Sequence, residues 1–213
     1  MSEVNIQAYL DTHLQLTQAI AGLSEEELKW KQTEAKWSVT EVLAHLADHN
    51  IVVSFRIRDI LAGTQARLPA FDQDQWVAGQ HSNDGNADDI LALFWSLVQY
   101  NGLLFARLNE QDWDKTGVNF KGETVRVRDI VRGFTNHVHH HIGQIERIKN
   151  AYRNQDVAAS SEASLTETAA SGSSCSISSV PATDSSSSCS ISSASPAASS
   201  CSVAPASAQG GNV

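Results

Sequence analysis

The chain has 213 residues and a formal net charge of −9 at pH 7, with 15 Lys and Arg against 24 Asp and Glu. This balance argues against a nucleic-acid-binding protein, because such proteins present a cationic face to the phosphates. No apolar run reaches the roughly 18 residues that a membrane-spanning helix needs. The N-terminal run also lacks the basic and apolar regions of a secretory signal. We therefore expect a cytoplasmic protein that engages neither nucleic acid nor a membrane.

The composition changes abruptly near residue 154. All eight His, all five Trp and every Lys and Arg precede residue 155, and the remainder is dominated by Ser and Ala. Such a stretch buries too little apolar surface to offset the entropy of ordering it. We predict one domain over residues 1–154, with a charge of about −5 and a single core, and a disordered tail over residues 155–213.

The tail contains a repeated motif. SSCSISS occurs at residues 173–179 and again at 187–193, and a shorter SSCSV follows at 199–203. All three cysteines lie in the tail, so none can cross-link the predicted domain. One interpretation is low-complexity drift. Another is that the Ser-Cys-Ser unit is recognised by a modifying enzyme, as in ribosomally made peptides whose Ser and Cys become heterocycles, with the domain as folded leader. A third is that the tail presents thiols to the domain's own metal.

Apolar spacing predicts a helix over residues 4–22 and a second over residues 38–62. Residues 24–27 form a capping box that opens a short turn of helix, and a second box opens the helix at Ser38. Gly63 is suited to end that helix. The expected inward stripes are Ile6, Leu10, Leu14, Thr17 and Ile20 in the first helix, and Val39, Val42, Leu46, Val53, Ile57 and Ile60 in the second.

Two further helices follow. The third opens at Asn86, where Asp88 and Asp89 favour the helix dipole, and the fourth covers about residues 127–153. Residues 64–85 and 109–126 are long irregular connections, and the second of these can hold a short extended piece. The expected inward stripes are Ile90, Leu93, Phe94, Leu97, Leu104 and Leu108 in the third helix, and Ile130, Phe134, His137, His141, Ile145 and Ile148 in the fourth. The pattern predicts an all-α four-helix bundle with two long connections, a fold that holds metal sites in its core.

His137 and His141 are the most informative pair. A four-residue step turns a helix by about 400°, so both rings leave the same face. Two neutral imidazoles in an apolar stripe need partners for four ring nitrogens, and a metal meets half of that demand. His139 falls on the outward side, and His140 lies about 60° off the stripe, where it can line the site without ligating.

The second helix carries another such pair, His45 and His49. One of them is expected to supply a third ligand, and we choose His45 because it lies nearer the apolar centre. His49 is either a fourth ligand or a group behind the ligands. Asp48 and Glu41 are carboxylates able to orient an imidazole, although Glu41 is better explained as a helix cap.

The run WSVTEVLAHLADHN at residues 37–50, followed by NHVHHHIGQIERI at residues 136–148, resembles the DinB family of bacterial metal-binding four-helix bundles, also called the DinB/YfiT-like fold. The match extends from Tyr9 to about Asn150. It includes the Trp-Ser opening of the second helix and the His-x-x-x-His-x-x-Gln pattern of the fourth. The resemblance implies a three-histidine site at His45, His137 and His141.

The family includes bacillithiol transferases and mycothiol-dependent isomerases, so the resemblance implies a metal-dependent enzyme that uses a low-molecular-weight thiol or a water. A divalent cation can ionise either one. Three imidazoles suit zinc, nickel, iron and copper alike. We predict thiol transfer or hydrolysis on a small molecule, with Gln144, Asp48 or His49 assisting the ligands. The alternative is a non-catalytic module that binds or sequesters metal, and a homodimer is compatible with either.

Substrate contacts are expected from the first long connection and the third helix. The candidates are Phe71, Trp76, His81, Tyr100 and Asn101. Arg56 and Arg58 can meet an anionic substrate, but an exposed face of the second helix explains them equally well.

Overall fold

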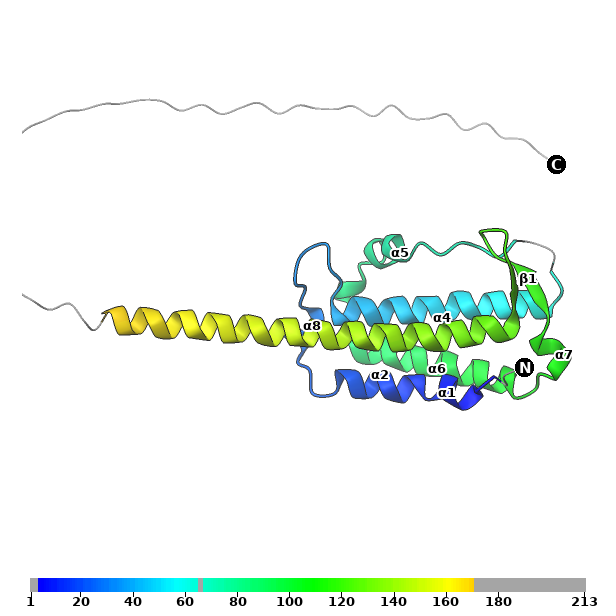
Figure 1. Ribbon diagram of the computed structural model, residues 1–213, viewed down its shortest axis with the longest axis horizontal. Coiled ribbons are helices and arrows are strands. Elements are labelled where there is room, and N and C mark those ends of the chain that lie inside the picture. The colour runs from blue at the N-terminus through cyan, green and yellow to red at the C-terminus, as the bar shows by residue number, and fades with distance from the viewer. Residues whose placement is uncertain (1–3, 65–66, 171–213) are drawn as a thin grey trace, which may run out of the picture. The chain divides into compact units, whose positions relative to one another are not determined.

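Four helical segments lie side by side in the computed structural model (Figure 1), which describes residues 4–64 and 67–170, with side chains up to residue 155. The segments are α1 (Ile6–Leu10) with α2 (Thr12–Ile20), α4 (Val39–Leu61), α6 (Ala87–Phe105) and α8 (Val127–Ala170). α4 packs against both α6 and α8, and the α1–α2 segment packs against the same two helices. The predicted all-α four-helix bundle is confirmed.

The predicted helix starts are confirmed by their caps. Ser24 and Ser38 each accept a hydrogen bond from the third helical residue, whose Glu side chain bonds back, so both capping boxes open their helices, α3 (Glu25–Lys29) and α4. Asn86 accepts from the backbone N–H groups of Asp88 and Asp89 at the start of α6. These caps satisfy donors that a helix end otherwise leaves unpaired. The six apolar residues predicted to face inward on α4 are all buried.

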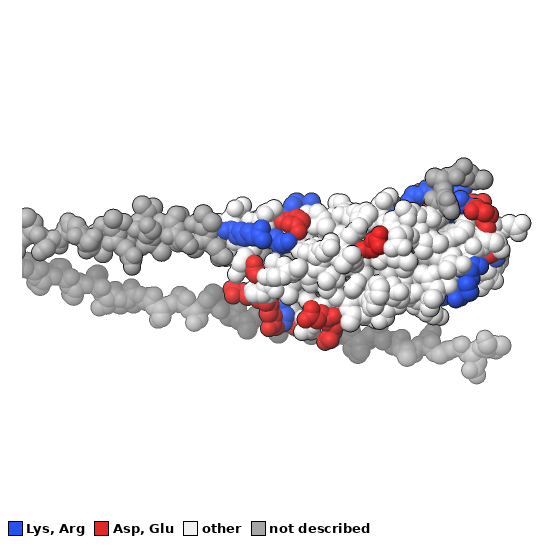
Figure 2. All heavy atoms as spheres, turned by 90° about the horizontal axis from the view of Figure 1, so that it is seen from below, with Lys and Arg blue, Asp and Glu red and all other residues white. Residues whose placement is uncertain are grey.

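The first helical segment faces the core with a different stripe from the one predicted. It is divided at Asp11, and Leu14, expected inside, is 57% exposed. Thr17 is exposed as well, while Tyr9 and Leu16 are fully buried. Apolar residues occur on two neighbouring stripes of this segment, and packing against α6 and α8 selects between them. Figure 2 shows the face seen from below, where charged side chains are sparse over the middle.

The prediction for α6 is wrong in the same way. Leu93 is 47% exposed, whereas Leu91, Val98 and Phe105 are buried beside Phe94. Of the other residues predicted to face inward, Ile90, Leu97, Leu104 and Leu108 are only partly buried. A helix that is apolar on most sides gives no single stripe, so its orientation follows from its neighbours.

Both long connections contain regular structure. The first holds α5 (Gln73–Gly79) and a 3₁₀ turn, η1 (Ser82–Asp84), and the second holds α7 (Glu110–Trp113) and a hairpin. The hairpin strands β1 (Thr116–Val118) and β2 (Thr124–Arg126) are antiparallel, with Gly117 opposite Val125. The expected extended piece is therefore one half of a two-stranded ribbon. Local capping side chains, such as Asp72 before α5, stabilise elements too short to show a helical period.

The last helix extends beyond the boundary predicted from composition. α8 continues to Ala170, so residues 155–170, predicted to be disordered, are helical. Extension of an existing helix avoids the cost of nucleation, and neither Gly nor Pro occurs between residues 144 and 171. The SSCSISS repeats and the three cysteines lie outside the described residues. Within residues 4–64 and 67–170, no helix combines the length and the apolar character needed to span a membrane.

Candidate metal centre

Three imidazoles from two helices converge in the bundle. His45 on α4 places its Nε2 2.8 Å from the Nε2 of His137 on α8, and the Nε2 of His141 is 3.1 Å from the same atom. One ligand atom from each of the three lies within 4.8 Å of the others. The predicted ligand set is therefore brought together, because the four-residue step on α8 puts both of its imidazoles on the side that meets α4.

The surroundings of these imidazoles favour their neutral form. His45 is 1% exposed and His141 is 5% exposed, while His137 is partly buried. Burial, reinforced by the neighbouring imidazoles, lowers the pKa of His45 to about 2. Burial likewise lowers the pKa of His137 to about 4 and shifts that of His141 downward. Neutral imidazole is the form that ligates a metal.

Hydrogen bonds alone cannot satisfy this cluster. Gln144 Oε1 lies 2.7 Å from Nδ1 of His141, which makes that nitrogen the donor and leaves Nε2 of His141 with a lone pair. His137 Nε2 carries at most one hydrogen, yet it faces both of the other Nε2 atoms. His45 also has a buried Nδ1 without a partner. A divalent cation among the three Nε2 atoms would accept every lone pair directed there, so the residues fit the metal that the family implies.

His49 and Asp48 lie close by, but neither joins this ligand group. The ring of His49 is centred 4.4 Å from that of His137, and its Nδ1 is buried without a partner. Burial, with repulsion from His137, lowers the pKa of His49 to about 3. Asp48 accepts a hydrogen bond from Gln80 (3.0 Å), and burial raises its pKa. Among the described contacts Gln144, rather than Asp48, holds an imidazole.

Aromatic rings from the segments before and after α4 pack against the cluster. Phe71 is nearly parallel to His45, with centroids 5.7 Å apart, and also stacks against His49. Trp76 on α5 meets Phe71 edge to face. Trp37, just before α4, is 5.1 Å from His45 and stacks on His141. The sequence indicates Phe71 and Trp76 as substrate contacts. Trp37 was missed there as a wall of the site, since its position before a helix cap says nothing about which ring it meets.

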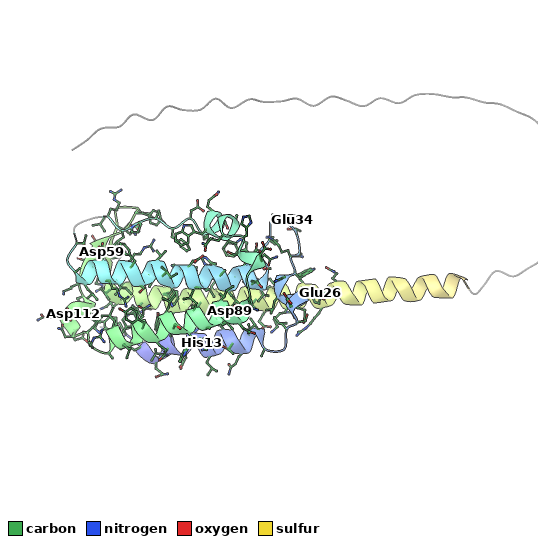
Figure 3. The ribbon with its side chains drawn as sticks, turned by 180° about the vertical axis from the view of Figure 1, so that it is seen from behind. His13, Glu26, Glu34, Asp59, Asp89 and Asp112 are labelled. Carbon is green, nitrogen blue, oxygen red and sulfur yellow. The ribbon has the colours of Figure 1, made fainter. Side chains whose placement is uncertain are left out.

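The other four histidines of the chain lie outside the cluster of ligand atoms. His139 is exposed and contacts Gln15 (2.9 Å), and His140 is exposed at the edge of the site. His13, labelled in Figure 3, lies on α2 with its ring 4.6 Å from Trp95. His81 is exposed in a left-handed backbone conformation before η1. None of these four belongs to the group of ligand atoms within the described residues.

Two of the predicted substrate contacts, Tyr100 and Asn101, lie at a different cluster of polar side chains. Asn101 is fully buried and bonds to Tyr9, Asn50 and Ser54, so its prediction as a substrate contact is wrong. Arg58 donates to Asn101 (2.8 Å) and lies over the exposed ring of Tyr100. The guanidinium of Arg58 is therefore held by contacts with residues of α6. Arg56 donates to the carbonyl of Pro69 (2.7 Å), which holds the first connection against α4.

The imidazoles open to a depression of about 430 Å³ between α8 and the segment before α4. Its lining is Ala35, Lys36, Trp37, Gln73, Asp74, His137, His140, His141 and Gln144. His137 and His141 therefore face this depression, whereas His45 and His49 stack against Phe71. An access route of this kind is typical of a catalytic metal site, which keeps a coordination position open.

Fold and site together define a four-helix bundle with a three-histidine centre suited to a divalent metal. The chain belongs to the DinB superfamily, whose family model matches residues 9–145. It is 25% identical over 137 residues to a protein of Oceanobacillus iheyensis named "Putative metal-dependent hydrolase", covering 62% of this chain and 75% of that protein. A protein of the same description from Bacillus licheniformis is 27% identical over 132 residues, with the same two coverages.

Solved structures show the same fold. YfiT from Bacillus subtilis, described as a probable metal-dependent hydrolase with an unusual four-helix bundle topology, superposes with a TM-score of 0.64 at 22% identity. The match covers 68% of this chain and 83% of YfiT. The mycothiol-dependent maleylpyruvate isomerase superposes with a TM-score of 0.55 at 14% identity, over 66% of this chain and 58% of the isomerase. These likenesses confirm the predicted fold.

Proposed function

We propose that the protein is a metal-dependent enzyme that hydrolyses a small molecule or transfers a thiol to it. His45, His137 and His141 would hold a divalent transition metal, which supplies an ionised water or thiol at neutral pH. The observation that carries the proposal is the convergence of three Nε2 atoms that hydrogen bonds cannot mutually satisfy. The names of the relatives and of YfiT support hydrolysis, and that of the isomerase supports a thiol co-substrate.

The residues around the ligands have separable tasks. Gln144 accepts the Nδ1 proton of His141 and so directs its Nε2 lone pair toward the other two imidazoles. Such partners orient ligands and raise their basicity. Phe71 and Trp37 exclude water from His45, which strengthens electrostatic interactions within the site. No cysteine occurs before residue 175, so a thiol nucleophile would come from a small molecule rather than from this domain.

A non-catalytic metal-binding module is the competing proposal. The closeness of His49 to His137 favours it, because a fourth imidazole would close the coordination shell. The depression that reaches His137 and His141 favours catalysis instead. The two proposals differ in whether an exogenous ligand can reach the metal.

The test is metal analysis of the purified full-length protein, followed by a screen of ester, amide and electrophilic substrates with and without small thiols. We expect about one divalent ion per chain and a turnover that a chelator abolishes and the ion restores. Metal bound at full occupancy, with an activity that chelation leaves unchanged, would contradict the enzymatic role of the centre.

A further inference from the structure

We propose that the groove in front of the imidazoles binds a small organic acid, with its carboxylate held by Lys36 and Arg147 and its other end directed to His137 and His141. This inference rests on the proposed function and names the substrate class for the same site. Neither cation was singled out by the sequence, because 110 residues separate them. Lys36 precedes the first family motif, and Arg147 lies in the second motif but outside its His-x-x-x-His-x-x-Gln pattern.

The groove is formed by two adjoining depressions. The one that reaches His137 and His141 shares Lys36, Trp37, His140 and Gln144 with a second depression, also of about 430 Å³. The second adds Gln32, Arg147 and Ile148 to the lining. Together they provide a continuous path along α8 from the imidazoles to Arg147. A ligand in this path would have one end at the metal position and the other between two cations.

The charges in the groove are not neutralised by the protein. Among the described residues, no ion pair involves Lys36 or Arg147, although Lys29, Lys31 and Lys149 all have acidic partners. The lining contains one carboxylate, Asp74, in the depression on the imidazole side. Two unpaired cations beside one groove are notable in a chain whose formal charge is −9, and they suit an anionic group.

The imidazoles and Arg147 border one continuous groove. Gln144 lines both depressions and holds Nδ1 of His141, so it joins the metal centre to the part of the groove that Arg147 lines. Trp37 lines both depressions and stacks on His141, so it offers an apolar surface to the middle of the ligand. The arrangement therefore fits a molecule with a carboxylate, a short carbon chain and a metal-binding group.

The test uses the full-length protein loaded with Co²⁺ and two thiols of equal length, 3-mercaptopropionate and 3-mercaptopropanol. Both bind through sulfur, which the thiolate-to-cobalt absorption reports, and only the first carries a carboxylate. We expect the acid to bind more tightly, and its advantage to fall about two- to fivefold for each of Lys36→Gln and Arg147→Gln. Added salt should reduce the same advantage in the wild type.

Arg107→Gln is the matched control, because Arg107 is exposed and remote on the chain, just after α6. It should leave the preference for the acid unchanged. Equal binding of the two thiols, or a preference that survives in the Lys36→Gln/Arg147→Gln double variant, would overturn the inference while leaving the metal centre intact. Failure of the wild type to bind Co²⁺ would contradict the proposed function itself, and with it the groove's role.

Discussion

The bundle buries two clusters of polar side chains, one around Asn101 and the other around His137. The Asn101 cluster links α1, α4 and α6 through Tyr9, Asn50 and Ser54, and only Asn50 Nδ2 lacks a partner. Burial raises the pKa of Tyr9 to about 12, so its hydroxyl remains a donor at neutral pH. In the His137 cluster, three Nε2 atoms meet, and His137 Nε2 has at most one hydrogen to offer the other two. The side chains of the Asn101 cluster satisfy one another's hydrogen bonds and so stabilise the fold. Those of the His137 cluster need a bound ligand to satisfy them.

The largest expected difference between the clusters concerns metal content. His137→Ala should reduce bound metal from about one ion per chain to nearly none, because two remaining imidazoles do not hold a divalent ion as three do. His139→Ala, two residues along the same helix and exposed, is the control and should retain the ion. Elemental analysis of the three proteins decides the matter, and equal content in all of them would refute the site.

Acid should destabilise the metal-free protein through the histidine cluster. The pKa values of His45, His49 and His137 are about 2, 3 and 4 in the folded protein, against about 6.5 when unfolded. Unfolding therefore takes up protons, so stability is fully present above pH 6.5 and falls as the pH drops toward 4.

Urea titrations of the metal-free protein between pH 7 and pH 4 measure this effect. Each proton taken up contributes a slope of about 1.4 kcal/mol per pH unit, and we expect about three protons near pH 5. Replacing His45 with Leu should remove one proton from the slope. A free energy of unfolding that stays flat from pH 7 to pH 5 would contradict the neutral state of the cluster.

A substitution in the Asn101 cluster should lower stability and leave metal binding intact, the reverse of what we expect for His137→Ala. Asn101→Ala leaves the hydroxyl of Tyr9 and the acceptor of Asn50 short of a buried donor, so it should cost about 2–4 kcal/mol of stability and leave metal content unchanged. Ser96→Ala, exposed on the same helix, should cost about 0.5 kcal/mol or less. Loss of metal in Asn101→Ala would show that the two clusters are coupled rather than independent.

The smallest effect is expected at Gln144. Gln144→Ala removes the acceptor that orients His141 and should weaken metal affinity by about 10- to 100-fold without abolishing binding. Gln15→Ala is the control, because Gln15 bonds to the exposed His139 instead. Competition with a chromophoric chelator compares the affinities. An unchanged affinity in Gln144→Ala would mean that packing alone orients the imidazole.

Much of the site could be predicted from residues that are neighbours along one helix. His137 and His141 share a face because of the helical period, and the boxes at Ser24 and Ser38 locate two helix starts. The orientations of α2 and α6 could not be predicted, since Leu14 and Leu93 are as apolar as the residues buried in their place. The extension of α8 was not predicted, because composition indicates only how much apolar surface a segment can bury. A helix can propagate without burying such surface.

By itself, the sequence determined the helix starts, the faces that carry each histidine pair and the membership in a metal-binding family. Tertiary structure alone decided that the Nε2 atoms of His45 and His137 meet, that Asn101 is structural and that Lys36 lies in the same groove as Arg147. The physical reason is the range of the interactions. Capping and periodicity act within a few residues, while contacts between helices depend on how whole faces pack.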